Sequence, residues 1–285
     1  MGHILANVGN HGVRIGRIAG IRITLDWTWF FIATLAVGSI TSAFAAAGTG
    51  FLLALLGGLL VAGGFFGSIL AHELGHALTA RRFGIRTESI ALHVFGGVAR
   101  LMGEPRTPRQ ELLISAAGPA VSLALAGGFW LLALALPAGL TIGLNVVVAT
   151  FSNLAYANLV LGLFNLLPGF PLDGGRILRA WLWSRKRSYS EGTRIAAKVG
   201  EGVGLGLMCL AAGLLFMTGA FGSSLMLGAI GFVVRQAARA EGLRVGSRVY
   251  ARPSGHEPGG GGESRGGTAR VVRLPDGRIV IVHDI

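Results

Sequence analysis

The sequence predicts an α-helical polytopic membrane protein with about six transmembrane helices, a small re-entrant β element and a short cytoplasmic β-hairpin tail. Three observations lead to this fold class: the composition, the spacing of the apolar segments and the placement of the basic residues. Of the 285 residues, 52% are hydrophobic and 13% are charged, whereas a typical soluble domain is about 25% charged. Too few polar side chains remain to cover a surface that faces water. Most of the chain is therefore expected to face the lipid bilayer.

Six apolar segments are candidates for membrane-spanning helices, which need roughly 20 mostly apolar residues. In chain order they are Trp27–Gly48, Phe51–Ala80, Leu112–Leu136, Ile142–Leu167, Val199–Gly219 and Phe221–Val234. The last of these is the shortest. The first 25 residues lack a short apolar core followed by a small-residue cleavage site, so a cleavable signal peptide is not expected there.

The basic residues lie in short clusters beside the apolar segments, and they give the chain a formal net charge of +12. Such clusters mark the cytoplasmic loops of membrane proteins. With six spans, every strongly basic stretch falls on one side of the membrane, and the uncharged loops at 48–50, 137–141 and 220 fall on the other. We therefore expect a multi-pass protein of the cytoplasmic membrane with both termini in the cytoplasm. Nucleic acid is not expected as a partner, because no folded basic domain is left to bind it.

Two stretches interrupt the helical pattern. Glu88–Leu101 is too short to span a membrane and has Gly96-Gly97 in its middle, so it is predicted to form two short strands around a glycine turn. Leu167–Gly175 contains two prolines and three glycines, which stop a helix. Non-helical backbone at membrane depth is tolerated only against protein or a water-filled cavity. Both stretches therefore indicate a functional site.

The composition changes after Gly242 and divides the chain into three regions. Residues 1–242 hold the apolar segments and form the predicted membrane domain. Residues 243–267 include Gly259–Gly262 and are typical of a flexible linker. Residues 268–285 alternate apolar and polar on both sides of Asp276-Gly277, which predicts a β-hairpin. A lone hairpin is only marginally stable in water, so this tail is expected to pack against other structure as a docking or regulatory element. The alternative is a disordered extension whose strand pattern never pairs.

The second apolar segment ends in His72-Glu73-Leu74-Gly75-His76. Residues four apart on a helix share one face, so the two histidines can bind one metal ion, with Glu73 placed to take a proton from metal-bound water. The short pattern also occurs by chance in unrelated proteins. Inside a membrane, however, His and Glu are costly and usually functional, and this segment holds no Lys or Arg to compensate them. One zinc ion per chain is therefore predicted here.

A catalytic zinc site usually has three protein ligands and a water, so a third ligand is expected. Glu88 and Glu111 are candidates, but Glu111 begins the third segment near two arginines, where a solvated helix-end charge is the better interpretation. Asp173 is the stronger candidate, because it lies just before the basic stretch that starts at Arg176. It therefore enters the membrane from the same side as the two histidines and at a similar depth. The alternative role for Asp173 is a helix N-cap.

Four motifs together resemble the site-2 protease family of intramembrane zinc metalloproteases, in that family's order and spacing. They are HELGH at 72–76, FGGVARL at 95–101, AAGPAVSL at 116–123 and NLLPGFPLDGGRILRA at 165–180. The resemblance implies that His72, His76 and Asp173 hold zinc. It also implies that Glu73 is the general base and that Asn165 helps to bind the substrate carbonyl or oxyanion. The sequence alone would instead make Asn165 a helix-packing amide.

The resemblance also implies a substrate and a way to bind it. The activity would be a zinc-dependent endopeptidase that cuts membrane proteins in or near their transmembrane segments. The strand at Phe95, Gly96, Gly97 and Val98 would pair with the unwound substrate, whereas the neighbouring His93 is expected to be structural. Many relatives carry nucleotide-sensing CBS domains or PDZ domains after the last helix. The tail here is too short for either, so neither is expected.

A transporter or metal carrier is the alternative function, because His and Asp within the membrane are also usual in such proteins. A transporter should show an internal pseudo-repeat, and the sequence has none that we detect. It would also have no need for Glu73 beside the metal ligands. A protein with this fold but without activity is disfavoured, because each catalytic position is filled.

Overall fold

The structure is a computed structural model of the chain. It describes residues 12–93, 96–137, 139, 141–250, 269–273 and 279–283, with side chains up to residue 244. The chain divides into two compact units, Met1–Ser247 and Arg248–Ile285. In the second unit, β5 (Ala269–Arg273) and β6 (Ile279–His283) pair antiparallel, as the alternating pattern predicts. The predicted turn at 276–277 and most of the predicted linker lie outside the described residues.

The first unit is mainly helical, as predicted. Its helices are α2 (Trp27–Ala46), α3 (Phe51–Arg82), α4 (Pro108–Ala135), α5 (Ile142–Asn165), α6 (Asp173–Lys186), α7 (Tyr189–Thr218) and α8 (Phe221–Tyr250). The last three residues of α8 belong to the second unit. Six of these are long and apolar enough to cross a membrane, and they correspond to the six predicted segments. The short helix α6 is the exception, and it begins at Asp173, inside the stretch Leu167–Gly175 that was predicted to interrupt the helical pattern. The helix-free part of that stretch is therefore shorter at its end than predicted.

Two helices differ in extent from the predicted segments. α7 begins at Tyr189, ahead of the predicted Val199, because the Ser188 hydroxyl accepts a hydrogen bond from the Glu191 backbone N–H at 3.2 Å and caps the helix. α8 continues past Val234, so its candidate span, Phe221–Arg244, is longer than predicted. Polar residues fill both extensions, and for this reason an apolar-segment criterion misses them.

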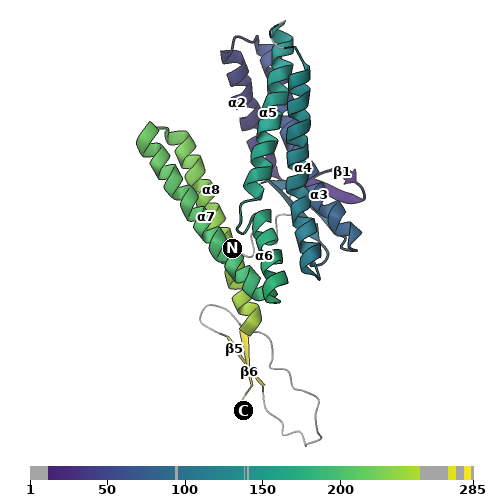
Figure 1. Cartoon of the computed structure of the whole chain (residues 1–285), viewed down its shortest axis with the longest axis vertical. Coiled ribbons are helices and arrows are strands. Elements are labelled where there is room, and N and C mark those ends of the chain that lie inside the picture. The colour runs from purple at the N-terminus through teal and green to yellow at the C-terminus, as the bar shows by residue number, and fades with distance from the viewer. Residues whose placement is uncertain are drawn as a thin grey trace, which may run out of the picture. The chain divides into compact units, whose positions relative to one another are not determined.

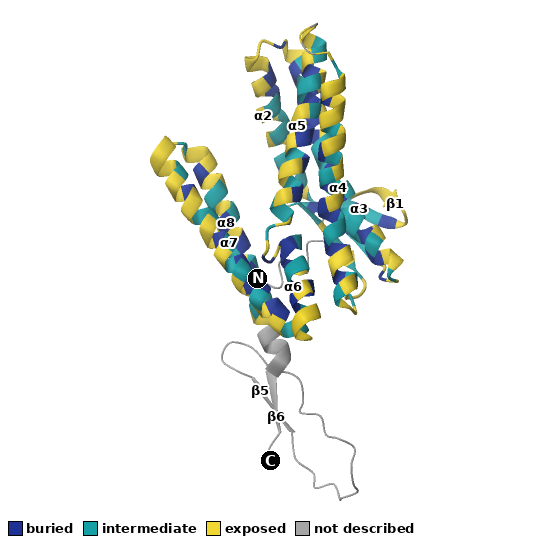
Figure 2. Cartoon of the chain, viewed as in Figure 1, coloured by how far each residue is buried: buried dark blue, intermediate teal, exposed yellow. Residues whose placement is uncertain are grey.

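α2, α3, α4 and α5 lie side by side (Figure 1) and approach closely at small residues. A Cβ atom added to Gly57 of α3 would lie 2.7 Å from the Phe44 ring of α2. In α7, a Cβ at Gly204 would lie 2.6 Å from the Gly231 carbonyl oxygen of α8. Such close approach through small residues is typical of helices in membranes. The outer faces of the helices are exposed in Figure 2 and carry large apolar side chains, as expected for contact with lipid.

A four-stranded sheet in the order β1-β2-β3-β4 lies against α3. Its strands are β1 (Val13–Ile18), β2 (Ile21–Leu25), β3 (Thr87–His93) and β4 (Gly96–Leu101). β2 and β3 are parallel, and the two outer pairs are antiparallel. The predicted strands of residues 88–101 are thus confirmed as β3 and β4, although Gly96-Gly97 begins β4 rather than forming the turn. β1 and β2 were not predicted from the sequence.

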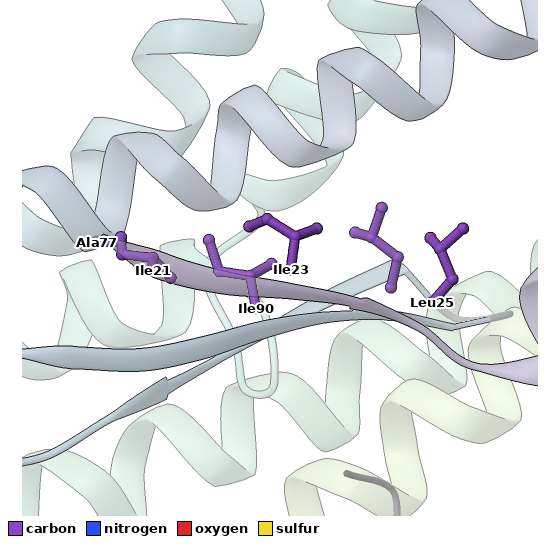
Figure 3. Close-up of a cluster of buried hydrophobic side chains, with 6 residues drawn as sticks. Ile21, Ile23, Leu25, Ala77 and Ile90 are labelled. Carbon is purple, nitrogen blue, oxygen red and sulfur yellow. The ribbon is translucent and has the colours of Figure 1, made fainter. Parts of the chain in front are cut away.

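The sheet is fixed to α3 by a small apolar core. Alternate residues of β2 point toward the helix, so Ile21, Ile23 and Leu25 are buried (Figure 3). They pack with Ile90 of β3 and with Ala77 of α3, which are both fully buried. Ala77 directly follows His76 in α3. The core therefore holds the sheet against the turn of α3 that carries the predicted site.

Candidate metal centre

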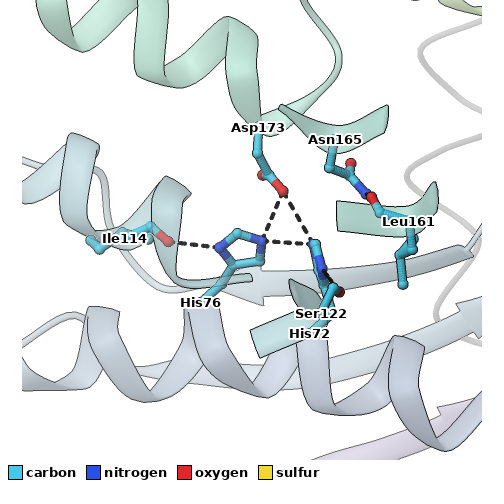
Figure 4. A network of polar contacts seen from close by, with 7 residues as sticks. All are labelled: His72, His76, Ile114, Ser122, Leu161, Asn165 and Asp173. Carbon is cyan, nitrogen blue, oxygen red and sulfur yellow. Dashed lines mark hydrogen bonds and ion pairs between the residues drawn. The ribbon is translucent and has the colours of Figure 1, made fainter. Parts of the chain in front are cut away.

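Helix α3 places His72 and His76 on one face, one turn apart, and α6 brings Asp173 to them from the other side (Figure 4). The His72 Nε2 and His76 Nε2 atoms are 3.2 Å apart, and each lies 3.1 Å from Asp173 Oδ2. His72 is buried, and the other two residues are nearly so. Within the part of the chain that the structure describes, this is the group of three residues able to hold a metal ion.

The donor atoms fit zinc in type and in spacing. Imidazole nitrogen and carboxylate oxygen are zinc ligands, and donors about 2.0–2.1 Å from a tetrahedral ion lie about 3.3 Å from one another. The three separations between these donors are close to that spacing. Three protein donors also leave one position of a tetrahedral ion for water, as in catalytic sites.

Helix α4 orients both imidazole rings from behind. His76 Nδ1 is 2.7 Å from the Ile114 carbonyl oxygen, to which it donates a hydrogen bond, and His72 Nδ1 is 2.9 Å from the Ser122 hydroxyl. Each contact occupies Nδ1 and so directs Nε2 toward the centre, which is the arrangement that metal-binding histidines use. Ser122 was not predicted as a site residue. The signal was its place within AAGPAVSL, but the motif does not show which of its side chains meets a histidine.

Gly118 is where the α4 backbone comes closest to the two histidines. A Cβ atom at this position would lie 2.6 Å from His72 Nε2 and closer still to His76 Nε2. Any side chain there would occupy the space where the two donor nitrogens meet. The centre therefore needs glycine at residue 118.

Glu73 lies on α3 between the two histidines and faces the start of β4. A Cβ atom at Gly97 would lie 3.0 Å from Glu73 Cδ and 3.2 Å from Glu73 Oε1. The β4 backbone thus passes directly over the carboxylate, as only glycine permits. Of the other predicted strand residues, Gly96 has a positive φ of 113° and the Val98 side chain is exposed. Phe95 lies outside the described residues.

Asp173 is the first residue of α6, and Leu172 occupies the N-cap position without a side-chain hydrogen bond. The predicted alternative of an N-cap aspartate is therefore wrong, because the Asp173 carboxylate bonds the two histidines instead. The other candidate ligands are bound elsewhere. Glu88 forms an ion pair with Arg22 at 2.5 Å, and Glu111 forms one with Arg179. Glu111 is buried, so its interpretation as a solvated helix-end charge is wrong.

Two further residues singled out from the sequence, Asn165 and His93, are not among the metal donors. Asn165 ends α5, and its amide donates to the Leu161 carbonyl oxygen at 2.9 Å (Figure 4), so in this structure it bonds within its own helix. His93 ends β3 and is not part of the metal-binding group. Burial lowers the pKa of His93 below its ordinary value, although the Asp26 carboxylate opposes the shift.

Comparison with known proteins agrees with this geometry. The family model described as Peptidase family M50 matches residues 60–139 and 134–207. The chain is 41% identical over 240 residues to a zinc metalloprotease of Mycobacterium tuberculosis, Rip3, covering 83% of this chain and 60% of that protein. A zinc metalloprotease of Synechocystis is 39% identical over 200 residues, covering 68% of this chain and 50% of the relative. This chain thus spans about half to 60% of the length of these relatives.

The fold of the chain also resembles that of a solved structure. The site-2 protease from Methanocaldococcus jannaschii aligns with a TM-score of 0.54 and 31% sequence identity, covering 81% of this chain and 95% of that one. The family match includes α3 with its two histidines, α4 and Asp173 at the start of α6. The chain therefore belongs to peptidase family M50, the site-2 proteases.

Proposed function

We propose that this chain is a zinc-dependent intramembrane endopeptidase that hydrolyses peptide bonds in or near the transmembrane segments of membrane proteins. The observation that carries the proposal is the convergence of His72, His76 and Asp173 within 4.8 Å of one another, beside Glu73, on helices apolar enough to lie in a membrane. The relatives' names, which are those of zinc metalloproteases, support it.

In this proposal His72, His76 and Asp173 hold the zinc ion. Bound zinc supplies a Lewis acid, which lowers the pKa of water and stabilises negative charge on a carbonyl oxygen. Glu73 directly follows His72 on α3 and is not one of the three metal-binding residues. Its carboxylate accepts the proton of the attacking water. It later returns that proton to the amine of the leaving chain.

Asn165 is proposed to bind the substrate carbonyl. In this structure the Asn165 amide donates to the Leu161 carbonyl oxygen of its own helix. That carbonyl is part of the hydrogen-bonded backbone of α5, so the amide can leave it and donate to a substrate carbonyl instead. A donor directed at the developing oxyanion stabilises the transition state more than the ground state.

The substrate is proposed to bind in extended form along β4. Among the described residues β4 is an edge strand of its sheet, with no strand paired to its outer side, so that side is available to pair with another chain. Because Gly97 contacts Glu73, a chain paired with β4 passes close to the general base. A helical substrate hides its peptide groups in internal hydrogen bonds, and pairing with an edge strand offers those groups new partners once the helix unwinds.

The protein is proposed to lie in the cytoplasmic membrane with its arginine-rich loops and both termini in the cytoplasm. The charge distribution of the sequence supports this orientation. The arginine-rich end of α3 directly follows the histidines, so the centre would open toward the cytoplasmic side, where water is available.

The first test is a single isosteric change. Glu73→Gln should abolish cleavage of epitope-tagged single-span membrane proteins in reconstituted vesicles while zinc content stays at that of the wild type, because the amide cannot accept the proton. Glu201→Gln, which alters a carboxylate paired with Arg239 between α7 and α8, is the matched control and should cleave normally. Near wild-type cleavage by Glu73→Gln would show that the assigned base is wrong.

A further inference from the structure

A buried ion pair joins α6 to α4 beside the metal centre. Arg179 of α6 and Glu111 of α4 are 6% and 1% exposed. The Arg179 Nε atom donates to Glu111 Oε1 at 2.7 Å, and Nη2 of the same guanidinium also contacts Oε1. The guanidinium lies between the rings of Phe170 and Tyr189, at 4.9 and 4.5 Å from their centroids. Arg179 is thus held by charge and by stacking at once.

The same guanidinium reaches the last two helices of the unit. Arg179 Nη1 lies 3.5 Å from the Thr193 hydroxyl of α7 and 3.9 Å from Glu241 Oε1 of α8. A cavity of about 210 Å³ borders Glu111, Arg179 and Glu241. The guanidinium therefore borders open space, and its charged and aromatic partners hold it in place.

The helix on which Glu111 lies also supports the two histidines. α4 provides the Ile114 carbonyl for His76, the Ser122 hydroxyl for His72, and the close approach at Gly118. Asp173 differs from the histidines, because its hydrogen bonds within the described residues are those to His72 and His76. Nothing else in that part of the chain holds its carboxylate, so its position depends on where α6 lies.

Stability gives a poor explanation for this pair. Burying two charges costs desolvation energy that their attraction often does not recover, and an apolar pair of similar volume is frequently as stable. A buried pair is better explained here by the geometry it fixes. Glu111 Oε2 even lacks a hydrogen-bond partner within the described residues, which a purely stabilising arrangement would avoid.

We propose that Arg179 is a positioning residue for Asp173. Its ion pair with Glu111 fixes the position of α6 relative to α4. The Asp173 carboxylate on α6 then lies against the two histidines, which α4 orients. The inference rests on the proposed function, since it assumes that the three residues hold zinc. Through Glu241, α8 contacts the same guanidinium, so a displacement of α8 would alter the geometry of the metal ligands.

The test replaces the pair without leaving an isolated buried charge. The double variant Glu111→Leu, Arg179→Met removes both charges and keeps apolar bulk, so it is expected to fold like the wild type by circular dichroism and gel filtration. Zinc affinity, measured by competition with a chelator, should fall about 10- to 100-fold, as for other groups that orient metal ligands. The visible spectrum of the cobalt-substituted protein should change as well, because the ligand geometry differs.

Two further variants complete the test. Arg179→Lys keeps the charge but loses the planar fork, so its zinc affinity should lie between the wild type and the double variant. Glu201→Gln alters the 2.9 Å ion pair with Arg239, whose side chains are both partly exposed, and it leaves Glu111, Thr193 and Glu241 in contact with Arg179. It should leave both zinc affinity and the cobalt spectrum unchanged.

The outcomes separate the two proposals. Folded Arg179→Lys and double variants that keep wild-type zinc affinity and cobalt spectrum would overturn the positioning role and leave the proposed function standing. If the double variant does not fold, a folded Arg179→Lys variant with unchanged affinity would overturn the positioning role equally. A wild-type chain that binds no zinc, or keeps it in a His72→Ala, His76→Ala variant, would overturn both.

Discussion

At the scale of single residues, the metal centre depends as much on the absence of a side chain as on its donors. Helix α4 can support both imidazoles only because residue 118 has no Cβ atom in the space between the donor nitrogens. The Ser122 hydroxyl and the Ile114 carbonyl then fix the rings, one contact each. The centre is therefore built by three helices, of which only α3 and α6 contribute donors.

Gly118→Ala should remove the metal from an otherwise folded protein. The added methyl would lie 2.6 Å from His72 Nε2 and must push at least one imidazole aside. Metal analysis should find about one zinc per chain in the wild type, as the three donors imply, and little in the variant. Gly127→Ala on the same helix is the matched control, because a Cβ there meets nothing within 4 Å. Full zinc content in Gly118→Ala would contradict the described approach of α4.

The site residues were predictable from the sequence to the extent that they are charged. His72, Glu73, His76 and Asp173 are expensive in a membrane, and a bound cation explains them, so the sequence could indicate them. Ser122 and Gly118 are neutral and common in membrane helices, and their importance appears only when α4 is placed against α3. The sequence alone does not show which residues of α4 lie next to the histidines of α3.

At the scale of elements, β4 joins the proposed substrate-binding edge to Glu73, the proposed general base. Its first residues pass over Glu73, and its free edge is available for pairing. The strand is held in place indirectly, since β3 and β2 connect it to the apolar core on α3. Movement of the sheet relative to α3 would thus move β4 relative to the base.

Gly97→Ala should separate metal binding from catalysis. The new Cβ would lie 3.0 Å from Glu73 Cδ and displace the carboxylate, and the three atoms nearest to it all belong to Glu73 rather than to the metal donors. Zinc content should stay at wild type, and the cleavage rate should fall about 100-fold, as expected for a base misplaced by about 1 Å. Gly16→Ala in β1, where a Cβ meets nothing within 4 Å, should keep the full rate. Loss of zinc in Gly97→Ala would instead mean that β4 supports the metal.

The helices were easier to predict than the sheet, for a physical reason. Each spanning helix must be apolar over most of its length, which leaves a strong signal. β1 and β2 are only 6 and 5 residues long. β2 is recognisable as buried once β3 lies beside it, because Ile21, Ile23 and Leu25 alternate toward α3. β1 is exposed along its whole length and has no such pattern.

At the scale of the whole molecule, the described residues include six helices long and apolar enough to cross a membrane. Six spans would put both termini on one side. The arginine-rich loops predict that this side is the cytoplasm. A fluorescent protein fused to the C-terminus should therefore fluoresce in cells, and alkaline phosphatase inserted at Ala220, between α7 and α8, should be active outside. Active phosphatase at the C-terminus, with none at Ala220, would reverse the orientation and place the centre toward the opposite face.

The second unit of the chain comprises Arg248–Ile285. Its strands β5 and β6 pair with each other, but a two-stranded hairpin is too small for a core of its own. We expect this hairpin to act as a docking or regulatory element that pairs with a strand edge of the enzyme or of a partner. Removing residues 251–285 keeps α8 and Glu241, so zinc content should not change, whereas the cleavage rate or the choice among substrates should.

A shorter chain ending at Gly242 provides the comparison, because it also removes the last turns of α8. Hydrogen exchange across residues 269–273 and 279–283 reports independently whether the strands are paired in solution, since a docked hairpin protects its amides. Unchanged rate and substrate choice after removal of residues 251–285, together with fast exchange in both strands, would leave the hairpin without a role. Protected strands with unchanged cleavage would restrict it to docking onto a partner that the purified assay lacks.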